Sequence, residues 1–183
     1  MTFNIIKDFI DNLFNNKYEI YLNIDDCGGL VIEFIGGEPF LQVNLMNEIL
    51  EYFIKKIPQD FQWTCLVSSN GTLVNTPQVQ IFIKKWFNNL HLVITFDGLK
   101  KYHDACRKFP NGEGSYDIVL KAITKYKQLF GTYPDNKITI SPDNLQYLAE
   151  NIKYLIKLGY YNLPVNTTYE GPWDIETAKI YYQ

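Results

Sequence analysis

Short apolar runs alternate along the chain with longer stretches in which apolar residues recur every three or four positions. The short runs are typical of buried strands, and the longer spacing is typical of amphipathic helices. The predicted strands span residues 30–35, 63–67, 92–96, 137–140 and 163–166. The predicted helices span residues 3–14 and 45–57, start at 76, 115, 141 and 174, and are stopped by glycine at 131 and 159. Alternating strands and helices predict a parallel sheet, and so one α/β domain over residues 1–183.

Polar or glycine-rich residues follow every predicted strand. The segments are Gly-Gly-Glu-Pro at 36–39, Ser-Asn-Gly-Thr at 69–72, Thr-Phe-Asp-Gly at 95–98, Ser-Pro-Asp-Asn at 141–144 and Asn-Thr-Thr-Tyr-Glu at 166–170. In a parallel sheet the carboxyl ends of the strands lie at one edge, where ligands bind. The run at 30–35 is apolar enough to predict a strand buried on both faces. The opening helix follows no predicted strand, and therefore resembles the partner of a strand that is not in this sequence.

The charge balance and hydropathy exclude two classes of partner. The chain has 183 residues and a net charge of −3, whereas nucleic-acid-binding proteins usually carry a basic stripe. The apolar runs are strand-sized, so we expect no membrane span. Residues 1–11 already contain Asn4, Lys7 and Asp8, which argues against a signal peptide and predicts a cytoplasmic protein.

The cysteines and the arginine are unusual in number. Cys27, Cys65 and Cys106 lie too far apart for a local metal-binding or cluster-binding loop, and three is an odd number for a disulfide framework. They are predicted to be reduced thiols packed as small apolar side chains. Arg107 is the single arginine among 17 basic residues, which, together with abundant asparagine and isoleucine, indicates a low-GC genome; an arginine kept against that bias suggests a role that lysine cannot fill.

The tetrapeptide at 36–39 carries the strongest chemical signal. Gly36 and Gly37 let the backbone come close to a ligand, and Glu38 with the neighbouring carbonyl groups can accept hydrogen bonds from an amine. A tight strand-to-helix turn closed by Pro39 explains the same residues equally well.

Four segments in register resemble one known family. Residues 31–41 resemble the GGEP segment of radical S-adenosylmethionine (radical SAM) enzymes, and residues 69–73, 95–107 and 112–117 resemble the TNGT, S-x-DG…HD…R and GxGS(Y/F) segments of the sulfatase-maturase-like, SPASM-type branch. Residues 137–144 and 166–173 are most similar to peptide maturases that modify ribosomally made precursor peptides.

The resemblance implies a fold, cofactors and a substrate. It implies a partial (β/α)6 TIM-like barrel with five parallel strands, S-adenosylmethionine (SAM), a 4Fe-4S cluster, and hydrogen abstraction from a precursor peptide by a 5′-deoxyadenosyl radical. The family's GGEP backbone receives the methionyl amine, a role that falls on Gly36, Gly37, Glu38 and Pro39. A ribose contact falls on Thr95. The resemblance implies no further catalytic residue.

The sequence departs from the family in one decisive respect. The CxxxCxxC loop that holds the cluster, the strand before it and the C-terminal auxiliary-cluster region are not in these 183 residues. The main hypothesis is therefore a truncated maturase core that is inactive alone. One alternative is a non-catalytic module that binds peptide or pairs with a cluster-bearing chain. Another is an unrelated βα enzyme in which the GGEP segment is coincidental.

Three smaller groups of residues have competing interpretations. His91, Asp97, His103 and Asp104 resemble a metal site, but His91 and Asp97 lie at opposite ends of one strand, so structural or solvent-facing histidines are favoured. Asp104 and Arg107, three residues apart, predict a local ion pair. Glu170 near Trp173 suggests a substrate cavity, although a polar edge with a packed tryptophan is favoured.

Overall fold

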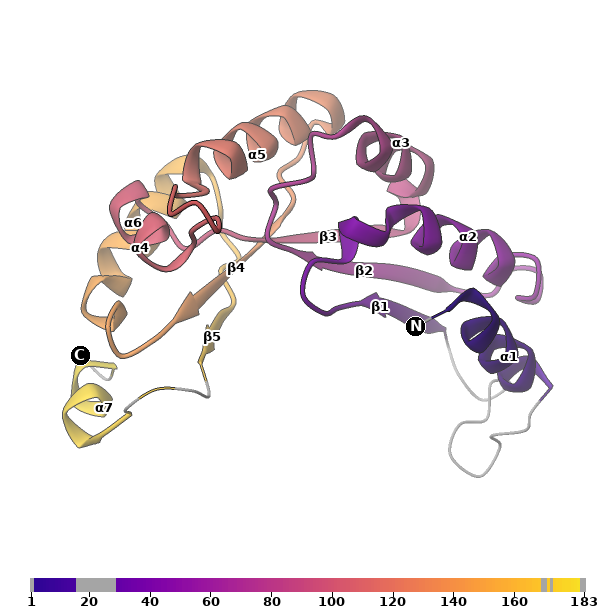
Figure 1. The fold of residues 1–183 in the computed structure, drawn as a ribbon, viewed down its shortest axis with the longest axis horizontal. Coiled ribbons are helices and arrows are strands. Elements are labelled where there is room, and N and C mark those ends of the chain that lie inside the picture. The colour runs from indigo at the N-terminus through magenta and orange to yellow at the C-terminus, as the bar shows by residue number, and fades with distance from the viewer. Residues whose placement is uncertain (1, 16–28, 169–170, 172, 182–183) are drawn as a thin grey trace. The chain divides into compact units, whose positions relative to one another are not determined.

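The computed structural model describes residues 2–15, 29–168, 171 and 173–181 (Figure 1). Its strands are β1 (Leu30–Phe34), β2 (Trp63–Ser69), β3 (Leu90–Thr95), β4 (Asp135–Ile140) and β5 (Val165–Thr167). Its α-helices are α1 (Phe3–Phe14), α2 (Val43–Phe53), α3 (Pro77–Trp86), α4 (Lys100–Cys106), α5 (Tyr116–Phe130), α6 (Leu148–Leu158) and α7 (Ile175–Tyr181). Short 3-10 turns span Pro39–Gln42, Phe87–Asn89 and Leu145–Tyr147.

The strands follow one another in the sheet in chain order, β1-β2-β3-β4-β5. The pairs β1–β2, β3–β4 and β4–β5 are parallel, as the alternation of strands and helices predicts. The described residues form two compact units. The first combines the chain up to residue 68 with residues 76–91, and the second combines residues 69–75 with the chain from residue 92 onward. The single domain over residues 1–183 stays a prediction.

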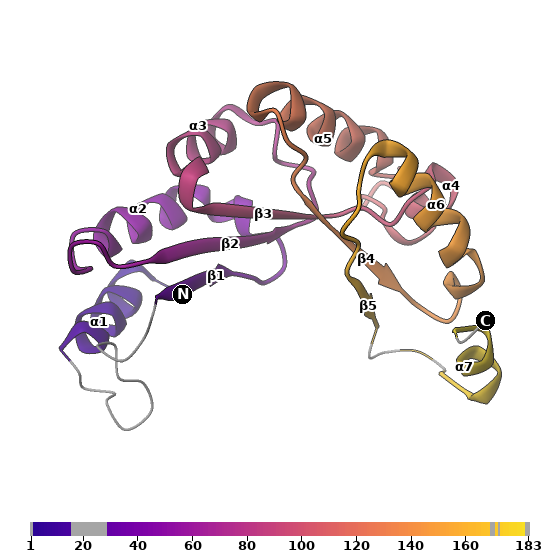
Figure 2. The same cartoon turned by 180° about the vertical axis from the view of Figure 1, so that it is seen from behind.

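The core of the first unit lies between its helices and one face of β1 and β2. Ile10 of α1 and Ile49 and Phe53 of α2 are buried together, and α2 runs alongside β2 in both views (Figures 1 and 2). Half-buried hydrophobic residues pack against them, namely Phe3, Ile6, Phe14, Leu30, Ile32, Phe34, Leu45, Tyr52, Ile57 and Trp63. The helical spacing of the apolar residues in 3–14 therefore identifies the buried face of α1.

The prediction that the first strand is buried on both faces is wrong. The exposure of β1 alternates, with Leu30, Ile32 and Phe34 toward the helices. Val31 on the opposite face is 65% exposed, and Ile35 just beyond the strand is 69% exposed. The described helices cover only one face of β1, which leaves the apolar residues of the other face in contact with solvent.

The second unit is built around β3 and β4. Ile94, Phe96, Ile138 and Ile140 are almost fully buried, and so are the following helical residues: Val119, Ala122 and Ile123 of α5 and Leu155 of α6. Helices α5 and α6 end at Gly131 and Gly159, whose φ angles of 77° and 104° confirm the predicted stops.

Local hydrogen bonds move two predicted helix boundaries. The segment after β4 does not begin a helix at Pro142, because the Asn144 side chain accepts from the Ser141 backbone N–H (2.8 Å) and a 3-10 turn precedes α6 at Leu148. Helix α2 stops at Phe53, and beyond it the N–H groups of Lys55 and Lys56 bond to carbonyls three residues back, Lys56 N to Phe53 O at 2.9 Å.

Three remaining features of the helices concern caps, an unexpected element and length. Asp174 is confirmed as the N-cap of α7, accepting from the Thr177 N–H at 2.8 Å. Helix α4 was not expected, because residues 100–106 lack an apolar stripe. Within the described ranges, no helix has the length and apolar character needed to cross a membrane.

Candidate functional site

The turn after β1 is anchored at one end and open at the other. Phe40 is 3% exposed, and Pro39 begins a 3-10 turn in which Glu38 Oε1 accepts from the Phe40 N–H (3.1 Å). Gly36 has a φ of 149°, and a Cβ atom at Gly36 or Gly37 would meet no atom within 4 Å. The exposed backbone groups of both glycines therefore face open space. They fit a ligand amine, provided that the carbonyl groups act as acceptors.

Thr95 belongs to the second unit and ends β3. Its neighbours Ile94 and Phe96 are fully buried toward the helices, whereas Thr95 is half-buried on the opposite face. The hydroxyl group of Thr95 is thus on the face of the sheet away from the helices. Gly36–Pro39 and Thr95 lie in different units, and their predicted convergence on one ligand stays a prediction.

The loop after β2 is braced by its own side chains. Ser69 Oγ accepts from the Gly71 N–H (2.9 Å), and Asn70 Oδ1 accepts from the backbone and hydroxyl groups of Thr72 (3.0 and 2.7 Å). Gly71 has a φ of 80°, and a Cβ atom there would lie 2.8 Å from the Ile94 side chain. The Ser-Asn-Gly-Thr segment therefore needs glycine at this position both for its conformation and for packing.

Asp97 links three segments of the second unit. Its carboxylate is 3% exposed; Oδ1 accepts from the Thr139 N–H, and Oδ2 accepts from Arg107 Nε, both at 2.8 Å. Arg107 therefore pairs with Asp97, and the predicted Asp104–Arg107 pair is wrong. Asp104 instead accepts from the Tyr116 N–H at the start of α5 (2.8 Å) and pairs with Lys100 (3.4 Å). The sequence spacing favoured Asp104 as the partner of Arg107, but spacing alone does not show that the buried carboxylate of Asp97 is closer to Arg107 in space.

His103 is a buried structural histidine. Its Nδ1 accepts from the Asp97 N–H (3.3 Å), so the ring proton is assigned to Nε2, which faces Ser115 Oγ at 3.0 Å. Burial lowers the pKa of His103 below its usual value of 6.5, and the nearby positive charge of Arg107 lowers it further, against the opposing effect of Asp97. The His-Asp segment thus joins the end of β3 to the start of α5.

The buried imidazole predicts that acid destabilises the protein. Because the pKa of His103 is lower in the folded state, the unfolded state binds more protons below pH 6.5, and stability falls as the pH drops from there through the folded pKa. His103→Gln should flatten this part of the profile of unfolding free energy against pH, measured by urea denaturation. His91→Gln is the exposed control. An unchanged slope in the His103 variant would contradict the assignment.

The described residues do not provide a site for an iron–sulfur cluster. They contain no group of three histidine, cysteine or acidic side chains placed to hold a metal ion. Cys65 is fully buried, and burial raises the pKa of its thiol to about 12, while Cys106 is exposed, so the prediction of a packed thiol is wrong for Cys106. Cys27 lies outside the described residues. The residues in hand therefore fit the amine of SAM but not the cluster.

Two other features bear on the predicted substrate region. Trp173 is half-buried and its Nε1 donates to the Thr168 carbonyl (2.8 Å), which supports a packing role. Glu170 lies outside the described residues.

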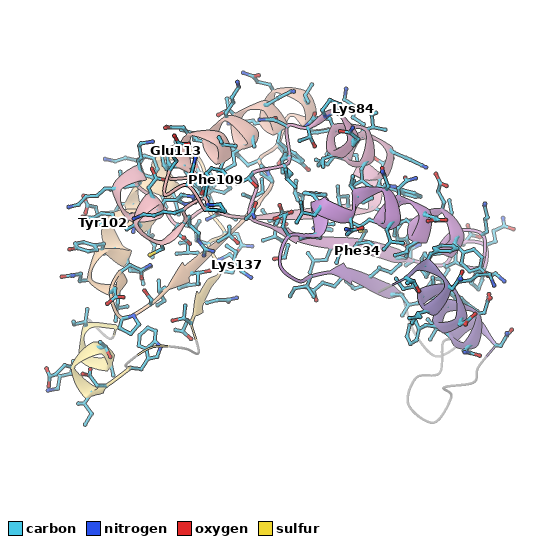
Figure 3. All side chains as sticks on the ribbon, in the orientation of Figure 1. Phe34, Lys84, Tyr102, Phe109, Glu113 and Lys137 are labelled. Carbon is cyan, nitrogen blue, oxygen red and sulfur yellow. The ribbon has the colours of Figure 1, made fainter. Side chains whose placement is uncertain are left out.

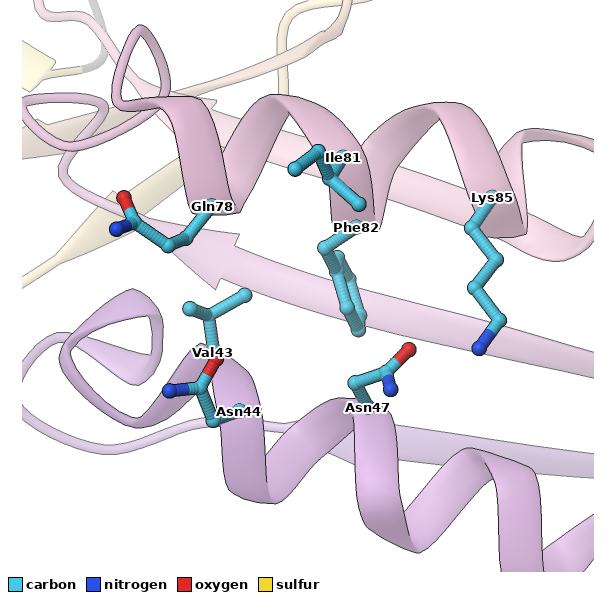
Figure 4. A pocket seen from close by; sticks show the side chains of 7 residues that line it. All are labelled: Val43, Asn44, Asn47, Gln78, Ile81, Phe82 and Lys85. Atoms are coloured by element: carbon cyan, nitrogen blue, oxygen red, sulfur yellow. The ribbon is translucent and has the colours of Figure 1, made fainter.

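A cavity of about 190 Å³ between α2 and α3 is lined by Val43, Asn44, Asn47, Gln78, Ile81, Phe82 and Lys85 (Figure 4). None of the predicted site residues lines this cavity.

Asn151 is a site-shaping residue that the sequence did not single out. Its side chain is 4% exposed, and its Oδ1 accepts from the Leu99 N–H (3.0 Å). Gly98, with a φ of 121°, packs so closely that an added Cβ atom would lie 2.5 Å from the Asn151 side chain. The sequence offered one signal, the Asp97-Gly98 pair, which predicts a turn. It does not show that Asn151 of α6 packs against this turn.

Comparison with known proteins identifies relatives by sequence. No protein-family model matches the chain. It is 31% identical over 157 residues to an uncharacterized protein of Methanocaldococcus jannaschii, covering 84% of this chain and 51% of that protein. It is 25% identical over 131 residues to the cysteine-type anaerobic sulfatase-maturating enzyme of Clostridium novyi, covering 69% of this chain and 32% of the enzyme. It is 24% identical over 123 residues to the radical SAM cyclopropyl synthase TigE of Paramaledivibacter caminithermalis, covering 67% and 24%.

Comparison with solved structures identifies the fold. Native anSMEcpe with bound AdoMet and Kp18Cys peptide matches 99% of this chain with a TM-score of 0.80 at 16% identity, and native anSMEcpe with bound AdoMet matches with a TM-score of 0.79. This chain covers 49% of either structure and about half or less of the curated relatives. The predicted α/β fold, a partial TIM-like barrel with five parallel strands, is confirmed, and so is the predicted resemblance to radical SAM peptide maturases.

Proposed function

We propose that this chain is the SAM-binding part of a radical SAM peptide maturase core. The observation that carries the proposal is the open diglycine turn after β1. It lies in a chain whose fold matches structures with bound AdoMet and whose sequence relatives include a sulfatase-maturating enzyme and a radical SAM cyclopropyl synthase. In this proposal the backbone of Gly36 and Gly37 accepts hydrogen bonds from the methionyl amine, Glu38 and Pro39 hold the turn, and Thr95 contacts the ribose.

The substrate in this proposal is a ribosomally made precursor peptide. Support comes from the solved structures of anSMEcpe, which are described with bound peptide. When bound, SAM together with a reduced 4Fe-4S cluster supplies the radical that abstracts hydrogen from the peptide. The residues of this chain contribute the binding and orientation of SAM.

The proposal includes a limit on the activity of these 183 residues. The sequence has no CxxxCxxC segment, and the described residues hold no metal-ligand group. We therefore propose that the chain alone does not cleave SAM reductively and acts in the cytoplasm with cluster ligands supplied from elsewhere.

The alternative is a non-catalytic module that binds a peptide or a cluster-bearing chain. The exposed face of β1, with Val31 and Ile35, favours it, because such a surface is available to another chain. This module would bind its peptide or partner without any turnover of SAM.

Calorimetric titration with SAM tests the proposal. The wild-type chain should bind SAM, and Gly37→Val, whose added side chain enters open space beside the turn, should bind it about tenfold more weakly without a loss of unfolding temperature. Ile81→Val, an exposed change on α3, is the control. After anaerobic treatment with iron and sulfide, we expect no 5′-deoxyadenosine.

Two results would contradict the proposal. Absence of SAM binding by the wild-type chain would contradict the SAM-binding role, and peptide binding without SAM binding would favour the non-catalytic module. Release of 5′-deoxyadenosine by the reconstituted chain would contradict the proposed inactivity.

A further inference from the structure

Lys137 lies on the face of β4 that the helices leave open. Burial alternates along β4, with Asn136, Ile138 and Ile140 buried and Lys137 and Thr139 half-buried on the other face. Figure 3 labels Lys137 beside β4. Lys137 is therefore a cationic side chain on the side of the sheet where a parallel barrel encloses its ligands.

The strand register gives Lys137 polar neighbours. Thr95 is paired with Lys137 across β3 and β4, and paired residues of parallel strands point to the same face. Thr139, two positions further along β4, lies on that face and is paired with Asn166 of β5. The ammonium group is thus accompanied by two hydroxyl groups and an amide, each able to donate a hydrogen bond to an anion.

Lys137 forms no ion pair among the residues that the structure describes, although Asp135 lies two positions earlier on the same face of β4. Five other lysines form ion pairs, namely Lys7, Lys56, Lys85, Lys100 and Lys179, whereas Lys137 forms neither an ion pair nor a side-chain hydrogen bond in the described ranges. The carboxylate of Asp97, at the end of β3, is already bonded to Arg107 and to the Thr139 N–H. The carboxylate of Asp97 is therefore bonded to Arg107 and the backbone of β4, and it does not pair with Lys137.

We propose that Lys137, with Thr139 and Asn166 on the same face, recognises a carboxylate group of the ligand bound there. The inference deepens the proposed function and rests on it. One ammonium group with neutral donors suits a single negative charge, whereas a phosphate is usually held by several cationic or backbone donors. The carboxylate belongs either to the methionyl group of SAM or to an acidic residue of the peptide.

A probe that carries only the carboxylate tests the site independently of SAM. In lysine-labelled protein, the NMR signal of Lys137, assigned with Lys137→Met, should shift saturably on addition of sodium acetate but not of sodium chloride at equal ionic strength. Lys153, exposed on α6, is the internal control. Equal shifts at both lysines would overturn the proposal.

Binding measurements then distinguish the two sources. If the source is SAM, Lys137→Met should weaken the binding of SAM about tenfold and leave the affinity for decarboxylated SAM unchanged. Lys153→Met should change neither affinity. If the source is the peptide, Lys137→Met should leave SAM binding unchanged and abolish the preference for a glutamate-containing model peptide over its glutamine counterpart. An unchanged affinity for both ligands would overturn the proposal. A response of Lys137, but not of Lys153, to acetate without any SAM binding would support the carboxylate site and contradict the proposed function alone.

Discussion

Arg107→Ala is expected to lower the free energy of unfolding by about 3–5 kcal/mol, because it removes the charge partner of a buried carboxylate. Asp97 is 3% exposed, and Arg107 Nε is 2.8 Å from its Oδ2. The Thr139 N–H would then be the remaining described donor to a carboxylate that cannot reach solvent. The measurement is urea denaturation monitored by circular dichroism.

Two controls separate this effect from the loss of a surface charge. Lys179→Ala removes an exposed ion pair with Glu176 and should cost about 0.5 kcal/mol or less. Asp97→Asn combined with Arg107→Met removes both charges and should be less damaging than Arg107→Ala alone. If Arg107→Ala costs no more than Lys179→Ala, the Asp97–Arg107 pair does not stabilise the link between β3, β4 and the loop before α5.

Gly98→Ala is also expected to lower the free energy of unfolding strongly, by about 3 kcal/mol, because backbone strain and overpacking act together. The φ angle of 121° is unfavourable for any side chain, and the new Cβ atom would lie 2.5 Å from Asn151. Asn151 would then have to move, which would break the hydrogen bond that its Oδ1 accepts from the Leu99 N–H. Thermal and urea unfolding would measure the loss.

Gly112→Ala is the matched control for the strain alone. Its φ angle is 87°, but no atom lies within 4 Å of the added Cβ position, so the expected cost is only about 1–2 kcal/mol. Equal losses for Gly98→Ala and Gly112→Ala would show that contact with Asn151 contributes nothing. A double variant, Gly98→Ala with Asn151→Ala, should recover part of the packing cost but not the strain.

The positions of several elements could be predicted because their signals are local. Apolar spacing places α1 at Phe3–Phe14, and glycine ends α5 and α6, because one residue must adopt a positive φ angle there. By contrast, α4 has no apolar stripe. Its buried residue, His103, is held by contacts with Asp97 and Ser115, which lie outside the helix.

The candidate site was likewise predictable only where its features depend on neighbouring residues in the sequence. The diglycine turn is a local feature, but the sequence favoured a ligand-binding turn and a tight strand-to-helix turn equally, and the role of its residues stays a prediction. The partner of Arg107 was predicted wrongly, because Asp97 is closer in space than Asp104 although it is further away in sequence. Lys137 gave no signal in the sequence, since its importance depends on the register with Thr95 and on the lack of a described ion pair.

By itself, the sequence determined the order of the strands and of the helices other than α4, the glycine stops, the presence of a turn at Gly36 and Gly37 and the resemblance to radical SAM enzymes. These depend on residues that are neighbours along the chain, where backbone conformation and side-chain spacing act directly. Only the tertiary structure decided which face of β1 is exposed, that Arg107 pairs with Asp97, and that Lys137 lies beside Thr95. Burial and charge pairing depend on distances between segments remote in sequence, and folding alone brings those segments together.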